Sequence, residues 1–157
     1  MTQRTKYIYA FISLLIIVII GFTIKMTYSA YVTRNKIHEA FLLAQPIQNA
    51  LNDYAVLHAG FNKDGELTNT SFGLPQPFEI QGTYIKSVVA RKEQGSQVVN
   101  IYAYINTNII PNLEDGRDIE LAAPYIQFNG NFEKSEVVWS CSSNIAKRYL
   151  PKDCSGS

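Results

Sequence analysis

Residues 7–24 read YIYAFISLLIIVIIGFTI, a stretch of eighteen residues without a charged side chain. As an α-helix it would span roughly 27 Å at about 1.5 Å per residue, close to the thickness of the hydrocarbon core of a membrane. Its central part, LLIIVII (residues 14–20), is apolar on every face, whereas a helix on a protein core needs only one apolar stripe. The stretch therefore predicts a transmembrane helix within an N-terminal segment of residues 1–27.

The flanks of this stretch indicate its orientation. Arg4 and Lys6 precede it and favour a cytoplasmic N-terminus, so that the rest of the chain is exported. The alternative is a cleaved signal peptide, whose apolar region usually runs about 7–15 residues. The run here is longer, and the best small-residue cleavage sequence has Tyr28 between Thr27 and Ser29. We therefore expect an uncleaved anchor.

A second helical pattern follows without a breaker, and residues 28–59 are expected to continue the same helix to about His58. Pro46 interrupts this pattern and should kink the helix rather than end it, because the apolar stripe continues in phase. The stripe repeats in steps of three and four residues. It comprises Ile37, Ala40, Phe41, Ala44, Ile47, Leu51, Tyr54, Ala55, Leu57 and His58.

The remainder of the chain changes to a β pattern. Residues 60–83 contain four glycines and two prolines, and they are expected to form a connecting loop. This loop includes a formal glycosylation sequon at residues 69–71, a motif too short and common to predict a glycan by itself. Strands are expected at residues 84–91, 98–105, 118–121 and 137–141, with turns at 92–96, 115–116 and 129–131.

Residues 84–157 are thus predicted to form a roughly four-stranded antiparallel sheet and a C-terminal loop. The apolar stripe of the helix needs a partner, and the inner face of the sheet can supply one. The expected fold class is α+β, with residues 28–157 forming one globular head.

Cys141 and Cys154 enclose twelve residues. An anchor that exports the head places both cysteines where disulfides form and persist, so we expect them to be bonded. Two free cysteines are the alternative. A metal site is not expected, because no second cysteine pair or nearby histidine supplies the remaining ligands.

The loop between the cysteines carries Lys147, Arg148 and Lys152 before a single acidic residue, Asp153. These three cations are candidates for surface recognition, since loops held on a scaffold often carry binding residues. A solvated loop without a ligand is an equally weighted alternative. Contact with DNA phosphates is a further hypothesis, for which three cations are few.

Composition and motifs exclude several classes of function. The formal net charge is +1, and aromatic residues make up 12% of the chain, which argues against a disordered protein. His38 and His58 are expected to fill structural roles on the helix. Neither a Ser/His/Asp order nor a glycine-rich phosphate loop nor an HExxH spacing occurs. We therefore expect a protein that is not an enzyme and that has no cofactor.

Three stretches together resemble the type IV pilins, in particular the type IVa class. Trp139-Ser140-Cys141, followed by Tyr149-Leu150-Pro151-Lys152-Asp153 before Cys154, resembles the family's C-terminal disulfide region. Tyr28, Tyr31 and Arg34 with residues 39–44 (EAFLLA) resemble the helix after the membrane segment. Residues 82–88 (GTYIKSV) resemble the start of the first strand.

The resemblance implies a lollipop-shaped subunit that resides in the bacterial inner membrane with a periplasmic head. Assembly machinery then extracts such subunits into an extracellular filament that serves adhesion, motility or DNA uptake. The implied partners are identical or related pilin subunits, packed through their N-terminal helices, and a host receptor or DNA. Candidate residues for helix–helix assembly are Tyr9, Leu14, Ile17 and Phe22.

The N-terminus departs from the family pattern. Arg4 stands where family members have the glycine before the cleavage site, Thr5 where they have an N-methylated aromatic residue, and Tyr9 where they have a glutamate. Three interpretations follow. The chain is an atypical or minor pilin, or it is a pilin-like bitopic membrane protein that is not processed or polymerised and acts as a binding or accessory module. The third is a sequence with an altered leader region.

Overall fold

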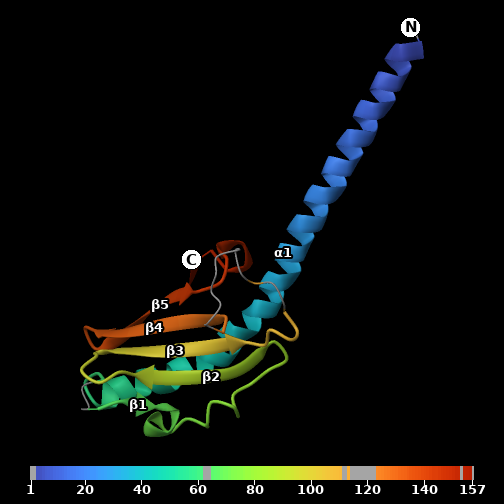
Figure 1. The fold of residues 1–157 in the computed structure, drawn as a ribbon. Coiled ribbons are helices and arrows are strands. Elements are labelled where there is room, and N and C mark those ends of the chain that lie inside the picture. The colour runs from blue at the N-terminus through green and yellow to red at the C-terminus, as the bar shows by residue number, and fades with distance from the viewer. Residues whose placement is uncertain (1–2, 62–64, 111–112, 114–122, 153, 157) are drawn as a thin grey trace.

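One long helix, α1 (Gln3–Leu57), begins the chain and forms both the projecting stalk and the back of the head (Figure 1). The computed structural model describes residues 3–61, 65–110, 113, 123–152 and 154–156, without the side chains of residues 3–6, 8–10 and 26. The helix runs through Pro46 without ending, as predicted. Its axis changes direction between the projecting part and the part that lies behind the sheet (Figure 1).

A six-stranded sheet covers the C-terminal half of α1. Its strands are β1 (Leu67–Thr68), β2 (Ile85–Lys92), β3 (Val98–Ile105), β4 (Tyr125–Glu133), β5 (Glu136–Ser143) and β6 (Cys154–Ser155). They lie in the order β1-β2-β3-β4-β5-β6, with all neighbours antiparallel except β5 and β6, which are parallel. The predicted α+β class is confirmed. Four long antiparallel strands form the sheet as expected, and a two-residue strand is added at each edge.

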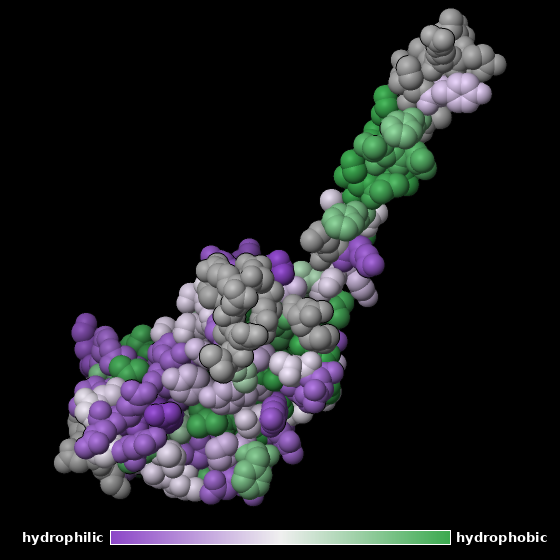
Figure 2. All heavy atoms as spheres, viewed as in Figure 1, coloured by the Kyte–Doolittle hydropathy of each residue, from purple (hydrophilic) through white to green (hydrophobic). Residues whose placement is uncertain are grey.

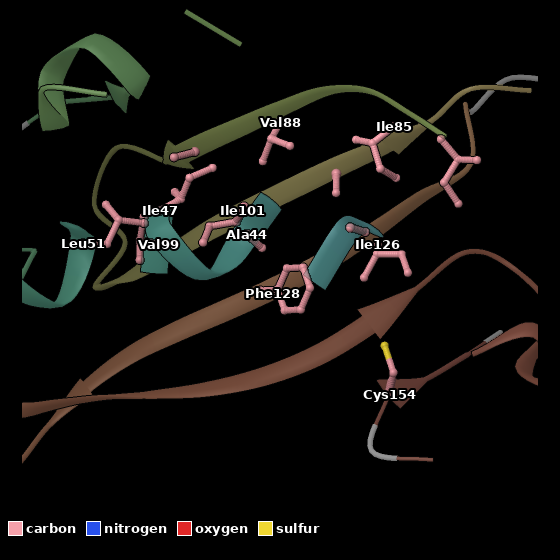
Figure 3. Close-up of a cluster of buried hydrophobic side chains, with 14 of the residues drawn as sticks. Ala44, Ile47, Leu51, Ile85, Val88, Val99, Ile101, Ile126, Phe128 and Cys154 are labelled. Carbon is pink, nitrogen blue, oxygen red and sulfur yellow. The ribbon is translucent and has the colours of Figure 1, made fainter. Parts of the chain in front are cut away.

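The apolar stripe of α1 packs on the inner face of this sheet. Six of its residues are buried at spacings of three and four: Ile37, Ala40, Ala44, Ile47, Leu51 and Ala55. Figure 3 shows several of them facing Val88, Ile101 and Phe128 of the central strands. Leu57 and His58, which the pattern also placed on the stripe, are exposed, because the helix ends at Leu57 beyond this core.

Three of the four predicted strands are confirmed, and they correspond to β2, β3 and β5. The fourth, at residues 118–121, lies outside the described residues. The third long strand of the sheet is β4 (Tyr125–Glu133), which the sequence pattern had not indicated.

The turn predicted at residues 129–131 is wrong, because Asn129, Gly130 and Asn131 lie within β4. Gly130 pairs with Trp139 on β5, and a Cβ atom at Gly130 would come within 2.7 Å of the indole ring. The glycine therefore leaves space for a large aromatic side chain on the neighbouring strand rather than forming a turn. The hairpin turns instead at Lys134 and Ser135, which have φ angles of 50° and 70°.

Residues 60–83 are more structured than a plain loop. They contain β1 and a short 3₁₀ helix, η1 (Asn69–Phe72). Asn69, the first residue of the formal sequon, is 1% exposed. Its side-chain amide donates to the carbonyl oxygens of Pro75 and Val88, at 3.0 and 3.2 Å, and its Oδ1 accepts from the backbone N–H of Ala90 at 2.6 Å. Asn69 is therefore a buried structural residue and not a glycan acceptor.

Glu39 of α1 joins the helix to the start of β2. Its carboxylate accepts hydrogen bonds from the backbone N–H groups of Thr83, Tyr84 and Ile85, at 2.9, 2.6 and 3.0 Å. A Cβ atom at Gly82 would lie 2.4 Å from the Glu39 carboxyl carbon, so the chain approaches this side chain closely only because residue 82 is glycine. The carboxylate thus determines where the connection meets the sheet.

Replacing Glu39 with glutamine is expected to lower the free energy of unfolding by about 1.5–3 kcal/mol, because the acceptor loses its charge and the amide NH2 group cannot accept from the N–H that it faces. Thermal or urea unfolding of the full chain in detergent, followed by near-UV circular dichroism, measures the change. Glu136→Gln is the matched control, since Glu136 is exposed on β5 and loses the same charge. Equal unfolding free energies for the two variants would show that the carboxylate of Glu39 has no special role.

Candidate functional site

The projecting part of α1 is the first candidate surface. Leu14, Ile17 and Phe22 are 60%, 65% and 64% exposed, and the fourth predicted assembly residue, Tyr9, has its side chain outside the described part. Figure 2 shows hydrophobic residues covering the visible face of this segment. Within the described residues, α1 is the one helix long and apolar enough to cross a membrane. Its most apolar 18-residue stretch has a mean hydropathy of 2.1, and none of that stretch is buried.

This exposure has a direct physical consequence. A helix that is apolar on all sides and exposed over most of its length leaves that surface to be covered by lipid or by other helices. Exchange of lipid for other apolar helices has little hydrophobic cost, since lipid tails are as apolar as leucine side chains. The segment is therefore suited both to a membrane and to a helical bundle.

The disulfide is the second candidate site. Cys141 of β5 and Cys154 of β6 are bonded, with their Cα atoms 4.6 Å apart, which confirms the predicted pairing. Cys154 is 1% exposed and lies at the edge of the core, as Figure 3 shows. The bond joins two strands that otherwise pair over only two residues, Cys141 with Cys154 and Ser142 with Ser155. It therefore holds the last strand on the sheet.

The loop closed by the disulfide packs against α1. Its short 3₁₀ helix, η2 (Lys147–Tyr149), is placed by Ile145 and Leu150, which are both buried on either side of it. The guanidinium of Arg34 on α1 donates to the carbonyl oxygen of Arg148 at 2.8 Å. The Arg148 guanidinium in turn lies 4.8 Å from the ring centroid of Tyr149.

The three cations predicted for surface recognition are all exposed. The structure places Lys147 and Arg148 together on η2, beside α1. Lys152 lies outside η2, two residues before Cys154 in the sequence. The sequence grouped the three by their positions in one loop, and the structure places two of them on the short helix that adjoins α1.

A cleft of about 380 Å³ lies between α1 and η2. Its walls combine apolar, cationic and hydroxyl groups from two parts of the chain that are far apart in sequence. The lining residues are Phe22, Lys25, Ser29 and Ala30 of α1 with Arg148 and Tyr149 of η2. Lys25 directly follows the apolar run in the sequence, and only the fold brings it beside the disulfide loop.

The outer face of the sheet is a third surface that sequence analysis had not identified. The rings of Tyr102, Tyr104 and Tyr125 lie with their centroids 5.5–6.3 Å apart. Partial burial, followed by the neighbouring Tyr125, raises the pKa of the Tyr102 hydroxyl above its ordinary value. Side-chain hydrogen bonds also link these strands. Gln127 Nε2 donates to the Oδ1 atoms of Asn100 and Asn129, and Asn129 Nδ2 donates to the Ser142 hydroxyl.

The sequence signal for this face was the alternation of Tyr102 and Tyr104 in β3. Tyr125 could not be added to it, because β4 was not predicted. The polar and aromatic side chains of this face alternate with the buried ones, as expected of an antiparallel sheet with one face in solvent.

Groups that would point to a metal site are not found in the part of the chain that the structure describes. No cluster of three or more His, Cys, Asp or Glu side chains able to hold a metal ion occurs there. His58 stacks on Tyr54, with ring centroids 4.2 Å apart, and its Nδ1 lies 2.8 Å from the Tyr54 carbonyl oxygen. Both interactions lie at the C-terminal end of α1.

Comparison with known protein families assigns this architecture. A family model described as Pilin (bacterial filament) matches residues 33–155, which span the amphipathic half of α1, the whole sheet and the disulfide loop. The match covers more than half of the chain. It begins after the projecting apolar part of the helix.

Proposed function

Because this chain belongs to the type IV pilin family, we propose that it is a structural subunit of a type IV pilus or a related filament, anchored in the inner membrane by α1 before assembly. The observation that carries the proposal is the exposed apolar half of α1. The apolar side chains of this segment are exposed, and either lipid or neighbouring helices can cover them. The proposed role is structural rather than catalytic, in keeping with the family.

We propose that Tyr9, Leu14, Ile17 and Phe22 contact the helices of identical or related subunits. Leu14, Ile17 and Phe22 are more than half exposed and, at about 100° per residue, lie on one half of the helix circumference, so they suit contact with neighbouring helices on that side. Before assembly, the head would lie on the periplasmic side. The basic residues at the N-terminus favour this orientation.

The head would carry the contacts that differ between filaments. Lys147, Arg148 and Lys152 are exposed on a loop held by a disulfide and by the contact with α1, which limits the entropy lost when a ligand binds. We propose this loop as a recognition surface for adhesion or DNA uptake. A host receptor or DNA would be its partner.

A second candidate function rests on the residues at the N-terminus. Tyr9 stands where the family has a glutamate, and Arg4 and Thr5 stand at the processing site. A subunit without that glutamate lacks the charge thought to pair with the neighbouring N-terminus. The alternative is therefore a pilin-like membrane protein that remains in the inner membrane as an accessory module.

Ile17→Asp is expected to remove the subunit from filaments. A carboxylate at the centre of an apolar helix costs about 2.5–3.5 kcal/mol, which corresponds to roughly 100-fold in an equilibrium constant. The protein would be expressed with pilus machinery, and its amounts in sheared filaments and in the inner membrane would be compared. Ile17→Leu, which keeps the side chain apolar, is the matched control and should assemble like the wild type.

The same experiment separates the two functions. The filament proposal expects the unmodified chain in the sheared fraction, where mass spectrometry of the N-terminus would also show whether it is trimmed. A chain that stays wholly in the inner membrane with Met1 intact would contradict polymerisation and support the accessory module.

A further inference from the structure

The cleft between α1 and η2 lies where the apolar run of the helix ends. Phe22 forms its apolar wall, and Lys25, one residue beyond Ile24, is the first charged residue after the run. In a membrane-anchored chain this is the height of the lipid headgroups, because the charged flanks of a spanning helix lie at the interface. The cleft would therefore open at the membrane surface on the side of the head.

The two segments that form the cleft are mainly cationic. The single acidic residue in residues 1–38 and in the disulfide loop, residues 142–153, is Asp153, whereas Lys25, Arg34, Lys147 and Arg148 all lie there. Within the described residues, neither Lys25 nor Lys147 forms an ion pair with a carboxylate. The cleft is thus cationic, with the Ser29 hydroxyl as an additional hydrogen-bonding group.

Two interactions within the fold fix the walls of the cleft before any ligand binds. The hydrogen bond from Arg34 to the Arg148 carbonyl oxygen holds η2 against the helix, and the Cys141–Cys154 bond closes the loop behind it. The guanidinium of Arg148 on η2 and the ammonium of Lys25 on α1 both line the cleft, and they match the charge of a phosphate group. The rings of Phe22 and Tyr149 provide an apolar boundary of the kind that suits the interfacial region.

We propose that this cleft binds the phosphate headgroup of an anionic phospholipid, with Lys25 and Arg148 on the phosphate and Phe22 beside the start of the acyl chains. The proposal rests on the membrane anchoring in the proposed function. A lipid is favoured over a free phosphate because the apolar wall at Phe22 continues directly into the lipid-facing part of the helix. The bound headgroup would hold the head against the membrane before assembly.

The test uses the full chain in nanodiscs. One set contains phosphatidylcholine alone, and the other contains a fraction of spin-labelled phosphatidylglycerol, whose enrichment around the protein is measured by electron paramagnetic resonance. The wild type is expected to enrich the anionic lipid over spin-labelled phosphatidylcholine on the order of five- to ten-fold at low salt, given the known attraction of juxtamembrane cations to anionic lipid. High salt should reduce this enrichment.

Two pairs of substitutions make the test specific. Lys25→Gln/Arg148→Gln should bring the enrichment close to one, and Lys25→Arg/Arg148→Lys should retain it, because the charges stay. Lys86→Gln/Lys134→Gln removes the same charge from two exposed positions outside the cleft and should leave the enrichment unchanged. Unfolding of the head, followed by circular dichroism, checks that each variant is folded.

Each outcome bears on a distinct part of the proposal. Failure of the chain to enter nanodiscs would overturn the anchoring and with it the lipid site. Normal insertion with equal enrichment in the wild type and Lys25→Gln/Arg148→Gln would overturn the lipid site alone. Full competition by millimolar inorganic phosphate at constant ionic strength would assign the cleft to free phosphate. A different result would assign the cleft to nucleic acid. Duplex DNA would then bind salt-sensitively to the protein in phosphatidylcholine nanodiscs, and Lys25→Gln/Arg148→Gln would abolish this binding. Enrichment of the anionic lipid would be equal in the wild type and the variant.

Discussion

The variant Cys141→Ser/Cys154→Ser is expected to lose about 2–5 kcal/mol of the free energy of unfolding, close to the value of roughly 3 kcal/mol that chain entropy predicts for a loop of this size. The two cysteines are 13 residues apart, and the bond joins β6 to a sheet that it otherwise contacts through two residue pairs. Without the bond, β6 has too few hydrogen bonds to remain in place. The basic loop would then lose its anchor on the C-terminal side.

Two measurements check this expectation. Urea unfolding of the full chain in detergent gives the free energy, and hydrogen exchange shows where protection is lost. Exchange should increase at residues 154–156 and in η2, with little change in β2 and β3. Wild-type protein treated with a reductant should behave like the double variant, whereas the reductant should leave the double variant unchanged. An unfolding free energy within 0.5 kcal/mol of wild type, a difference typical of neutral surface substitutions, would contradict a stabilising role for the bond.

Asn69→Ala is the second substitution with a large expected effect, a loss of about 3 kcal/mol or more in the free energy of unfolding. β1 pairs with β2 only at Leu67 and Thr68, and the chain then leaves the strand. The Asn69 side chain continues the hydrogen bonding along this edge of β2. It accepts from the Ala90 N–H and donates to the Val88 carbonyl oxygen. Alanine would leave these buried groups and the Pro75 carbonyl without a partner, and each unsatisfied group costs about 1–3 kcal/mol.

The same unfolding assay measures this effect, with Asn108→Ala as the matched control. Asn108 is exposed, so its substitution should change the free energy by less than about 0.5 kcal/mol. Asn69→Asp should also destabilise the head, because its carboxylate would face the Pro75 and Val88 carbonyl oxygens without an N–H to donate. Equal stabilities of Asn69→Ala and Asn108→Ala would show that the buried amide is dispensable.

Helix periodicity in the sequence was sufficient to predict α1 and the side of it that is buried. The spacing from Ile37 to Ala55 repeats with the period of an α-helix, and the same residues are buried in the structure. The apolar run of residues 7–24 needs no tertiary information either, because every face of that helix is apolar. The strands β2 and β3 followed from their β-branched and aromatic residues, and the disulfide followed from two cysteines in a head that was expected to be exported.

Local sequence was misleading where a side chain from a distant strand determines the conformation. Asn129-Gly130-Asn131 has the composition of a turn, and only the Trp139 ring beside Gly130 explains why it is a strand. Asn69 likewise has the sequence of a glycosylation site, and only the edge of β2 together with the Pro75 carbonyl gives its side chain three hydrogen-bond partners.

The candidate sites divide in the same way. Lys147, Arg148 and Lys152 were identifiable from the sequence as one basic loop, but their arrangement was not. The Arg34 hydrogen bond to Arg148 places part of that loop against α1, more than 100 residues away along the chain, and so creates the cleft with Lys25. Periodicity and composition depend on residues that are close together in the sequence, so they were sufficient to predict the apolar helix, its stripe and the strands β2, β3 and β5. The Trp139–Gly130 contact, the buried Asn69 and the cationic cleft depend on contacts between distant segments, which only the folded chain brings together.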